Sequence, residues 1–282
     1  MLIIKKSINK LFFYIISILD KFFIFKAYHY QVINFALSKT SIVRHNGLNL
    51  FLSTPTKLSK WRAETFSSKE PETLEWIDNF DNNTVFWDIG SNIGLYSIYA
   101  ALKSECEVYC FEPSFFNLEL LSKNIYLNNV SNKITICPFA LSDKRTNSLL
   151  NFTTTEWGGA LSTFDQDYGF DGKKLNKVFT QSSIGISADD AKKLLKFNQP
   201  DYVKIDVDGI EHLILLGALN ILQKTKEVLI EVNDNFKLQS DTCINMLAKS
   251  GFRLSSKKHS EMIENSNNDF NKTYNQIWKK SS

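Results

Sequence analysis

The chain has 282 residues, of which 43% are apolar and 22% are charged, and its formal net charge is +3. This length suits one large domain or two small ones, and the composition is that of a globular protein rather than a disordered or fibrous one. Because the charge bias is weak and no long run of lysine or arginine occurs, we expect no nucleic-acid partner.

The amino-terminal segment predicts an amphipathic helix, because apolar residues recur at helical spacing with polar ones largely opposite. The stripe is Ile4, Ile8, Leu11, Ile15, Leu19 and Phe22, and the opposite face has Lys6, Lys10, Ser17 and Lys21. The longest uncharged stretch, residues 11–19, is shorter than the roughly 20 residues of a spanning helix. No small-residue cleavage site follows, so we do not expect a signal peptide. Such a helix can pack onto the body of the protein, which we favour, or lie on an anionic membrane surface.

The four cysteines, Cys106, Cys110, Cys137 and Cys243, form no C-x-x-C pair and have no histidine at ligand spacing. We therefore expect reduced, buried thiols and no zinc site, which fits a cytoplasmic protein, either free or associated with a membrane.

The next part of the chain predicts a hairpin and a helix. Residues 41–54 contain Asn46-Gly47, a strong turn signal between apolar runs. Residues 70–80 predict a helix with Pro71 in its first turn. We assign residues 1–83 to an N-terminal extension and residues 84–282 to the main domain.

From residue 84 strands and helices alternate, which predicts an α/β fold with a mostly parallel sheet. The predicted strands are 84–90, 106–113, 133–142, 201–209 and 227–233, and the predicted helices are 94–104, 117–129, 187–197, 211–223 and 240–252. Residues 148–164 and 176–186 predict extended segments between the third and fourth strands. Residues 252–257 and 274–280 predict an antiparallel hairpin at the edge of the sheet.

The turn after the first strand, "DIGSNIG", indicates a ligand-binding loop. Gly90 and Gly94 allow positive φ and a close approach of a ligand to the backbone, and Asn92 tolerates left-handed φ. The loop lacks the glycines and lysine typical of a phosphate-binding loop, and Asp88 would repel a pyrophosphate. A ligand that carries hydroxyls or an ammonium group fits better.

Glu112 stands at the end of the second strand, where an acidic side chain can accept hydrogen bonds from ribose hydroxyls. A nucleoside without phosphates and with an ammonium group satisfies both observations. That ligand is S-adenosylmethionine.

Four segments together resemble the FkbM family of S-adenosylmethionine-dependent methyltransferases: "FWDIGSNIGLYS", "VYCFEPSFFNLELLSKNIYLNN", "PFALSD" and "VKIDVDGIEHLILLGA". The resemblance runs from about residue 84 to about residue 235. It implies a class I methyltransferase fold with a Rossmann-like sheet whose last strand is antiparallel, and methyl transfer commonly to a hydroxyl oxygen.

The resemblance also implies roles for residues. Those that would line the methionine end of the cofactor are Asp88, Gly90, Asn92 and Gly94; Glu112 would hold the ribose, and Ala140 and Asp143 would lie near the adenine. The family more often has glutamate where Asp208 stands, so the role of Asp208 does not follow directly from the family.

The segment "VKIDVDGIEH" is where we expect catalysis. If the strand stays extended, Lys204, Asp206 and Asp208 share one face, at the carboxyl end where ligands of open α/β sheets bind. We expect Asp206 and Asp208 to face the transferred methyl, with Asp206 also touching the cofactor and with Glu211 and His212 just beyond. A carboxylate or neutral imidazole there could accept the proton of the attacking hydroxyl.

A metal ion is the alternative to this mechanism. Magnesium could bind to Asp206, Glu231 and Asn233, although we expect no metal. Trp157, Gly158 and Gly159 could form a rim for a sugar substrate, or an ordinary turn beside a core tryptophan.

The preferred function is O-methylation of a hydroxyl on a glycan, glycolipid or related metabolite. The alternatives are an N-methyltransferase, a small-metabolite methyltransferase, and a non-catalytic cofactor-binding partner in glycan assembly.

Overall fold

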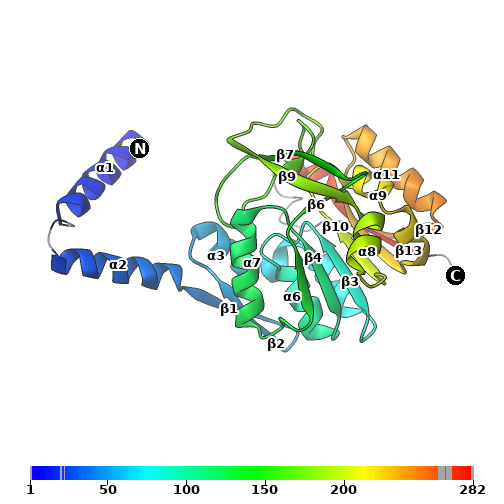
Figure 1. Cartoon of the computed structure of the whole chain (residues 1–282), viewed down its shortest axis with the longest axis horizontal. Coiled ribbons are helices and arrows are strands. Elements are labelled where there is room, and N and C mark those ends of the chain that lie inside the picture. Colours follow the sequence, from blue (N-terminus) through cyan, green and yellow to red (C-terminus); the bar gives the residue numbers. More distant parts are fainter. Residues whose placement is uncertain (1, 20, 22, 260–263, 265–268, 281–282) are drawn as a thin grey trace.

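The computed structural model describes residues 2–19, 21, 23–259, 264 and 269–280. Its centre is a seven-stranded sheet whose strands lie in the order β12 (Phe252–Lys258), β13 (Thr273–Lys280), β11 (Glu227–Asn233), β10 (Tyr202–Ile205), β3 (Val85–Ile89), β4 (Glu107–Phe111) and β5 (Ile134–Cys137). The pairs from β11 to β5 are parallel, and β13 is antiparallel to both of its neighbours. The predicted class I fold, with an antiparallel last strand, is confirmed (Figure 1).

The sheet strands are apolar on both faces because helices cover both sides. Alternate residues of β3 divide accordingly: Phe86 joins one core cluster, whereas Trp87 and Ile89 join the other. In β4, Val108 and Phe111 divide in the same way.

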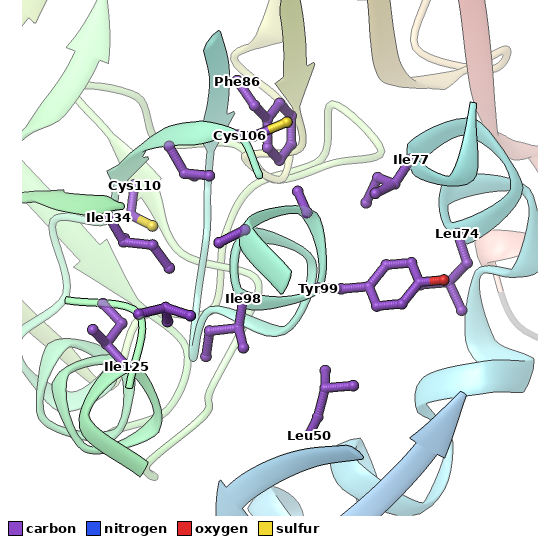
Figure 2. Packing of buried hydrophobic residues seen from close by; sticks show 14 of the residues in the cluster. Leu50, Leu74, Ile77, Phe86, Ile98, Tyr99, Cys106, Cys110, Ile125 and Ile134 are labelled. Carbon is purple, nitrogen blue, oxygen red and sulfur yellow. The ribbon is translucent and has the colours of Figure 1, made fainter. Parts of the chain in front are cut away.

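The first face is covered by α6 (Leu95–Lys103) and α7 (Phe115–Leu127) and by the N-terminal elements. Figure 2 shows Ile98 and Tyr99 of α6 between the sheet residue Phe86 and the N-terminal residues Leu50 and Leu74. Residues 48–80 therefore share one core with the sheet.

The second face is covered by α8 (Ala188–Leu195), α9 (Glu211–Leu216), α10 (Leu219–Lys224) and α11 (Lys237–Lys249). The single helix predicted over 211–223 is two helices that are separated at Gly217. A Cβ atom at Gly217 would stand 2.2 Å from the carbonyl oxygen of Ser142, so the break lets the chain pass close to a second sheet.

That second sheet has the order β6 (Ala140–Ser142), β9 (Phe179–Ser187), β7 (Thr146–Phe152) and β8 (Thr163–Phe164). The single strand predicted over 133–142 is therefore wrong: β5 ends at Cys137, and β6 pairs with β9 instead. Pro138 lies at the break, where a residue without an N–H cannot continue the ladder.

The N-terminal part contains β1 (Thr40–His45), β2 (Leu48–Ser53), α3 (Lys57–Glu64), α4 (Phe66–Lys69) and α5 (Pro71–Asp78), and η1 (Asp269–Lys272) is a short 3-10 helix before β13. The predicted hairpin is confirmed, since β1 and β2 pair antiparallel and Asn46 and Gly47 both have positive φ, as a two-residue type I′ turn requires. Helices α3 and α4 were not predicted. The division at residue 83 remains a prediction.

The helices α1 (Leu2–Leu19) and α2 (Phe23–Leu37) extend away from the body (Figure 1). Packing onto the body was the favoured expectation, and it is wrong for Leu11 and Ile15, which are exposed, whereas Leu19 is half-buried. The structure does not describe the side chains of Ile4, Ile8, Lys6 and Phe22. Within the described ranges, no helix is long and apolar enough to cross a membrane. The four cysteines are free and buried, as predicted.

Candidate active site

A cavity of about 620 Å³ opens at the carboxyl ends of β3, β4, β10 and β11, the edge where open α/β sheets bind ligands. The loops after these strands form its floor. Helices α3 and α4 and the segment 153–162 form the opposite wall. The cavity therefore joins the loops found in the sequence with an N-terminal region that carried no recognised motif.

The glycine loop lies on the cavity wall through Gly90 and Asn92, whereas Gly94, which we also expected at the cofactor, does not line the cavity. Gly90 has φ of +85°, and a Cβ atom there would stand 1.8 Å from the carbonyl oxygen of Asp206. Gly94 has φ of +82° at the start of α6, and a Cβ atom there would stand 2.4 Å from Leu121 Cδ1. Glycine at position 90 thus lets the loops after β3 and β10 meet, whereas at position 94 it lets α6 pack on α7.

Asn92 ties this loop to the opposite wall. Its Nδ2 donates to the carbonyl oxygen of Gly159 at 2.7 Å, and Asn117 Nδ2 donates to the same oxygen at 3.1 Å. Gly159 lines the cavity, whereas Trp157 of the predicted rim does not and instead packs under Lys123, whose Nζ lies 5.5 Å from the ring centroid.

Glu112 lies on the wall beside the glycine loop. Its Oε2 accepts from the backbone N–H of Asn92 at 2.9 Å, and its Oε1 accepts from that of Ser114 at 2.8 Å. Burial raises the pKa of Glu112 to about 7. The carboxyl group is thus fixed in place with its oxygens at the cavity, where ribose hydroxyls can reach it.

Asp88 does not line the cavity. It is fully buried behind the loop, where Oδ2 accepts from Ser97 Oγ at 2.5 Å and Oδ1 has no hydrogen-bond partner among the described residues. Burial raises its pKa despite the nearby Lys204. The structure therefore places Asp88 as a support of the loop, and not in the contact with the ligand that we expected.

Only one of the two residues predicted near the adenine lines the cavity. Ala140 lines the cavity, whereas Asp143 does not and accepts a hydrogen bond from Ser142 Oγ at 3.2 Å.

Asp206 lines the cavity and pairs with a buried lysine. Lys204 Nζ stands 2.6 Å from Asp206 Oδ2 and 5.2 Å from the centroid of the Tyr96 ring, and Lys204 is 1% exposed. Burial opposes its charge, but Asp206, Glu70 and Asp88 outweigh burial and raise the pKa of Lys204. A permanent positive charge therefore lies under the cavity floor.

Asp208 also lines the cavity, by a different route from the one predicted. The strand ends at Ile205, and Asp208 has φ of +60°, so two-residue alternation does not reach it. Its Oδ2 accepts from the backbone N–H of Leu161 at 2.7 Å. Burial raises the pKa of Asp208 to about 6, and repulsion from Asp206 adds to the rise.

Glu231, at the end of β11, completes a group of carboxyls: ligand atoms of Asp206, Asp208 and Glu231 lie within 4.8 Å of one another. Burial raises the pKa of Glu231 well above its ordinary value, and the other two carboxylates add to this. Asn233 does not join the group, because its side chain bonds to Thr273 Oγ1 and to the backbone N–H of Asn235.

Glu211 and His212, which we expected just beyond these carboxylates as candidate catalytic residues, do not line the cavity. Glu211 is fully buried and accepts from the backbone N–H groups of Val207 and Gly209 and from Gln239 Nε2, and burial raises its pKa to about 7. His212 is buried with its ring against Phe236, and burial lowers its pKa. Glu211 holds the turn that carries Asp208, and we assign neither residue to the chemistry.

Three charged residues of the opposite wall were missed in the sequence: Arg62, Lys69 and Glu70. Arg62 Nε donates to the carbonyl oxygen of Gly158 at 2.6 Å, and Lys69 Nζ donates to Glu70 Oε1 at 2.6 Å. Burial would raise the pKa of Glu70, but Lys69 and Lys204 outweigh it and lower the pKa to about 2. No local signal marks these residues, because only the folded chain brings α3 and α4 over the sheet.

The comparison with known families decides the identity of this site. The methyltransferase FkbM domain matches residues 88–263. The chain belongs to the FkbM methyltransferase family. The cofactor of the family is S-adenosylmethionine.

Individual proteins that resemble this chain share low sequence identity with it. A hexuronic acid methyltransferase from Haloferax volcanii is 24% identical over 181 residues, which cover 61% of this chain and 66% of that protein. The crystal structure of a methyltransferase FkbM from Methylobacillus flagellatus has 15% identity and a TM-score of 0.49, over 71% of this chain and 44% of that one. TYW2 of M. jannaschii in complex with AdoMet has 13% identity and a TM-score of 0.41, over 86% and 88%.

The residues around the cavity fit S-adenosylmethionine. Ser91 Oγ is buried in the cavity wall with no hydrogen-bond partner among the described groups, so it can bond to a ligand. Glu112 presents a carboxyl group to the same space, and Gly90 leaves the backbone bare. Polar groups of this kind, with the apolar Ala140 and Leu141 beside them, suit a nucleoside joined to an amino acid.

Proposed function

We propose that the protein transfers the methyl group of S-adenosylmethionine to a hydroxyl oxygen of an acidic sugar. The observation that carries the proposal is a single cavity that is lined both by the glycine loop with Glu112 and by the charged residues Asp206, Asp208 and Arg62. The first set suits the cofactor, and the second offers a base and a cation to an acceptor.

S-adenosylmethionine supplies a methyl group on a positively charged sulfur, which is already strongly activated. The acceptor hydroxyl must lose its proton as the new bond forms, and a carboxylate within hydrogen-bond reach can take it. Asp208 suits this step because its raised pKa makes it a stronger base than an ordinary aspartate, while it is still largely ionised at pH 7.

Asp206 suits a positioning role. Its Oδ2 is held by Lys204 at 2.6 Å, which orients the carboxylate at the floor of the cavity. Orientation of the two reactants supplies much of the rate when the methyl donor is already activated.

Arg62 supports an acidic acceptor. Its Nε donates to the carbonyl oxygen of Gly158, and within the described part of the chain the two terminal nitrogens of the guanidinium have no carboxylate partner, so they can pair with one on an acceptor. Lys69, whose side chain is 34% exposed, adds a second cation on the same wall. A hexuronic acid carries both a carboxylate and hydroxyls, and the printed name of the Haloferax relative is consistent with this class.

The test is an assay of the purified protein with isotopically labelled S-adenosylmethionine and matched glucuronic acid and glucose oligosaccharides. We expect label in the uronic acid product, as an acid-stable O-methyl group identified by mass spectrometry. Cofactor binding without transfer to any sugar would favour a non-catalytic binding partner, and label on nitrogen would favour an N-methyltransferase.

Asp208→Asn tests the base in the same assay. Because a positioned base contributes typically 10²–10⁴-fold, we expect kcat to fall by about 100-fold or more while cofactor affinity stays within about threefold. Asp165→Asn is the matched control, since Asp165 also has φ of +60° but does not line the cavity. Equal losses in the two variants would remove Asp208 from the chemistry.

A further inference from the structure

The helices α1 and α2, together with the short segment before β1, form an arm that projects from the body (Figure 1). The arm comprises residues 2–39. Its described side chains are largely uncovered: Phe13 is 67% exposed and Phe35 is 70% exposed. The other exposed large apolar residues of the arm are Leu11, Phe12, Tyr14, Ile15, Ile18, Tyr28, Tyr30, Val32, Ile33 and Leu37. Contiguous apolar surface of this extent marks a site of interaction.

The charge of the arm indicates that its partner is anionic. Through residue 39 the sequence has one acidic residue, Asp20, against six lysines: Lys5, Lys6, Lys10, Lys21, Lys26 and Lys39. Among these, Lys10, Lys21 and Lys39 are exposed beside the apolar side chains. Two copies of the arm packed together would bring like charges together, whereas an anionic surface would neutralise them.

The arm is suited to lie on a bilayer and not to cross it. No described helix is long and apolar enough to span, and α1 contains Lys5, Lys6 and Lys10 within its turns. Tyrosines favour the interface between headgroups and acyl chains, since the ring is apolar and the hydroxyl is polar, and Tyr14, Tyr28 and Tyr30 are exposed along the arm.

We infer that the arm binds the surface of a membrane that contains anionic lipids, with its aromatic and aliphatic side chains at the acyl boundary and its lysines at the headgroups. The arm leads through the β1–β2 hairpin into α3, which contributes Arg62 to the cavity. This inference does not depend on the proposed function.

The experiment is vesicle flotation of the full chain with phosphatidylcholine vesicles, with and without phosphatidylserine. We expect binding to the anionic vesicles that weakens as salt is raised, and little binding to the neutral ones. The variant F12S/F13S/Y14S should lose at least tenfold in partitioning, and K10E/K21E/K39E should lose the preference for anionic lipid.

The matched control is Y126S/V178S/I184S, which removes three equally exposed apolar side chains from the body. It should bind like the unaltered protein. Equal binding by the arm and control variants, or no binding to either kind of vesicle, would overturn the inference. So would self-association in sedimentation without lipid binding, if the arm variant abolished it. Methyl transfer to a water-soluble acceptor, measured in parallel, reports separately on the proposed function.

Discussion

Two sets of groups line the cavity, and they differ in kind. In the backbone set, backbone amides and one carboxyl group come from the two neighbouring strands β3 and β4 and the turns that follow them. In the charged set, side chains come from α3, α4, β11 and the turn after β10, which are brought together from distant parts of the sequence. A common cofactor can be held by backbone geometry, whereas recognition of a particular acceptor depends on side chains.

The largest expected effect on binding comes from Gly90→Ala, in the backbone set. Because a Cβ atom at Gly90 would overlap the backbone oxygen of Asp206, neither loop can yield without moving its strand. We expect the Kd for S-adenosylmethionine to rise by about 100-fold, equivalent to about 3 kcal/mol, as measured by calorimetry.

Gly47→Ala is the control for that change. Gly47 has a similar φ of +78° but no atom within 4 Å of the added Cβ, so the alanine meets only backbone strain. Wild-type cofactor affinity in both variants would contradict the role of the loop.

A smaller effect is expected in the charged set, from Arg62→Gln. Since a hydrogen bond to a charged group is worth about 2 kcal/mol, kcat/KM for a uronic acid acceptor should fall by about 30-fold. A neutral sugar acceptor should be affected less than about twofold, because it has no carboxylate to pair with the guanidinium.

Arg44→Gln, on the exposed side of β1, is the matched control and should change neither acceptor. Parallel losses with charged and neutral acceptors would reduce Arg62 to a structural partner of Gly158.

Near neutral pH, the smallest effect is a pH dependence in the charged set. With Asp208 as the base, only its ionised form is active, and its pKa is raised to about 6 by burial and by Asp206. Thus kcat/KM should level off above about pH 6 and fall about tenfold per pH unit below it. An ordinary aspartate would keep its activity down to about pH 4. The residual activity of Asp208→Asn should not fall in this way below pH 6. If the same fall persists in that variant, another group is responsible for it.

The site shows where sequence interpretation succeeds and where it stops. Gly90, Asn92 and Glu112 line the cavity and follow directly from strand and turn signals, because each lies within a few residues of its own strand. Gly94 comes from the same signals, but it serves the packing of α6 on α7 and does not line the cavity. Glu211 and His212 follow the same motif in sequence, yet they lie behind the turn, because the chain bends at Ile205 and Asp208 occupies the cavity instead.

By itself, the sequence determined the strand-helix alternation, the glycine turn, the hairpin at Asn46-Gly47 and the carboxyl groups at the ends of β4 and β10. These depend on local propensity and on the period of the apolar pattern. Only the tertiary structure decided that β5 and β6 belong to different sheets, that Asp88 lies behind the loop, and that Arg62 and Lys69 lie over the cavity. The reason is physical: these positions depend on which surfaces pack together across long distances in the chain, and no local pattern records that.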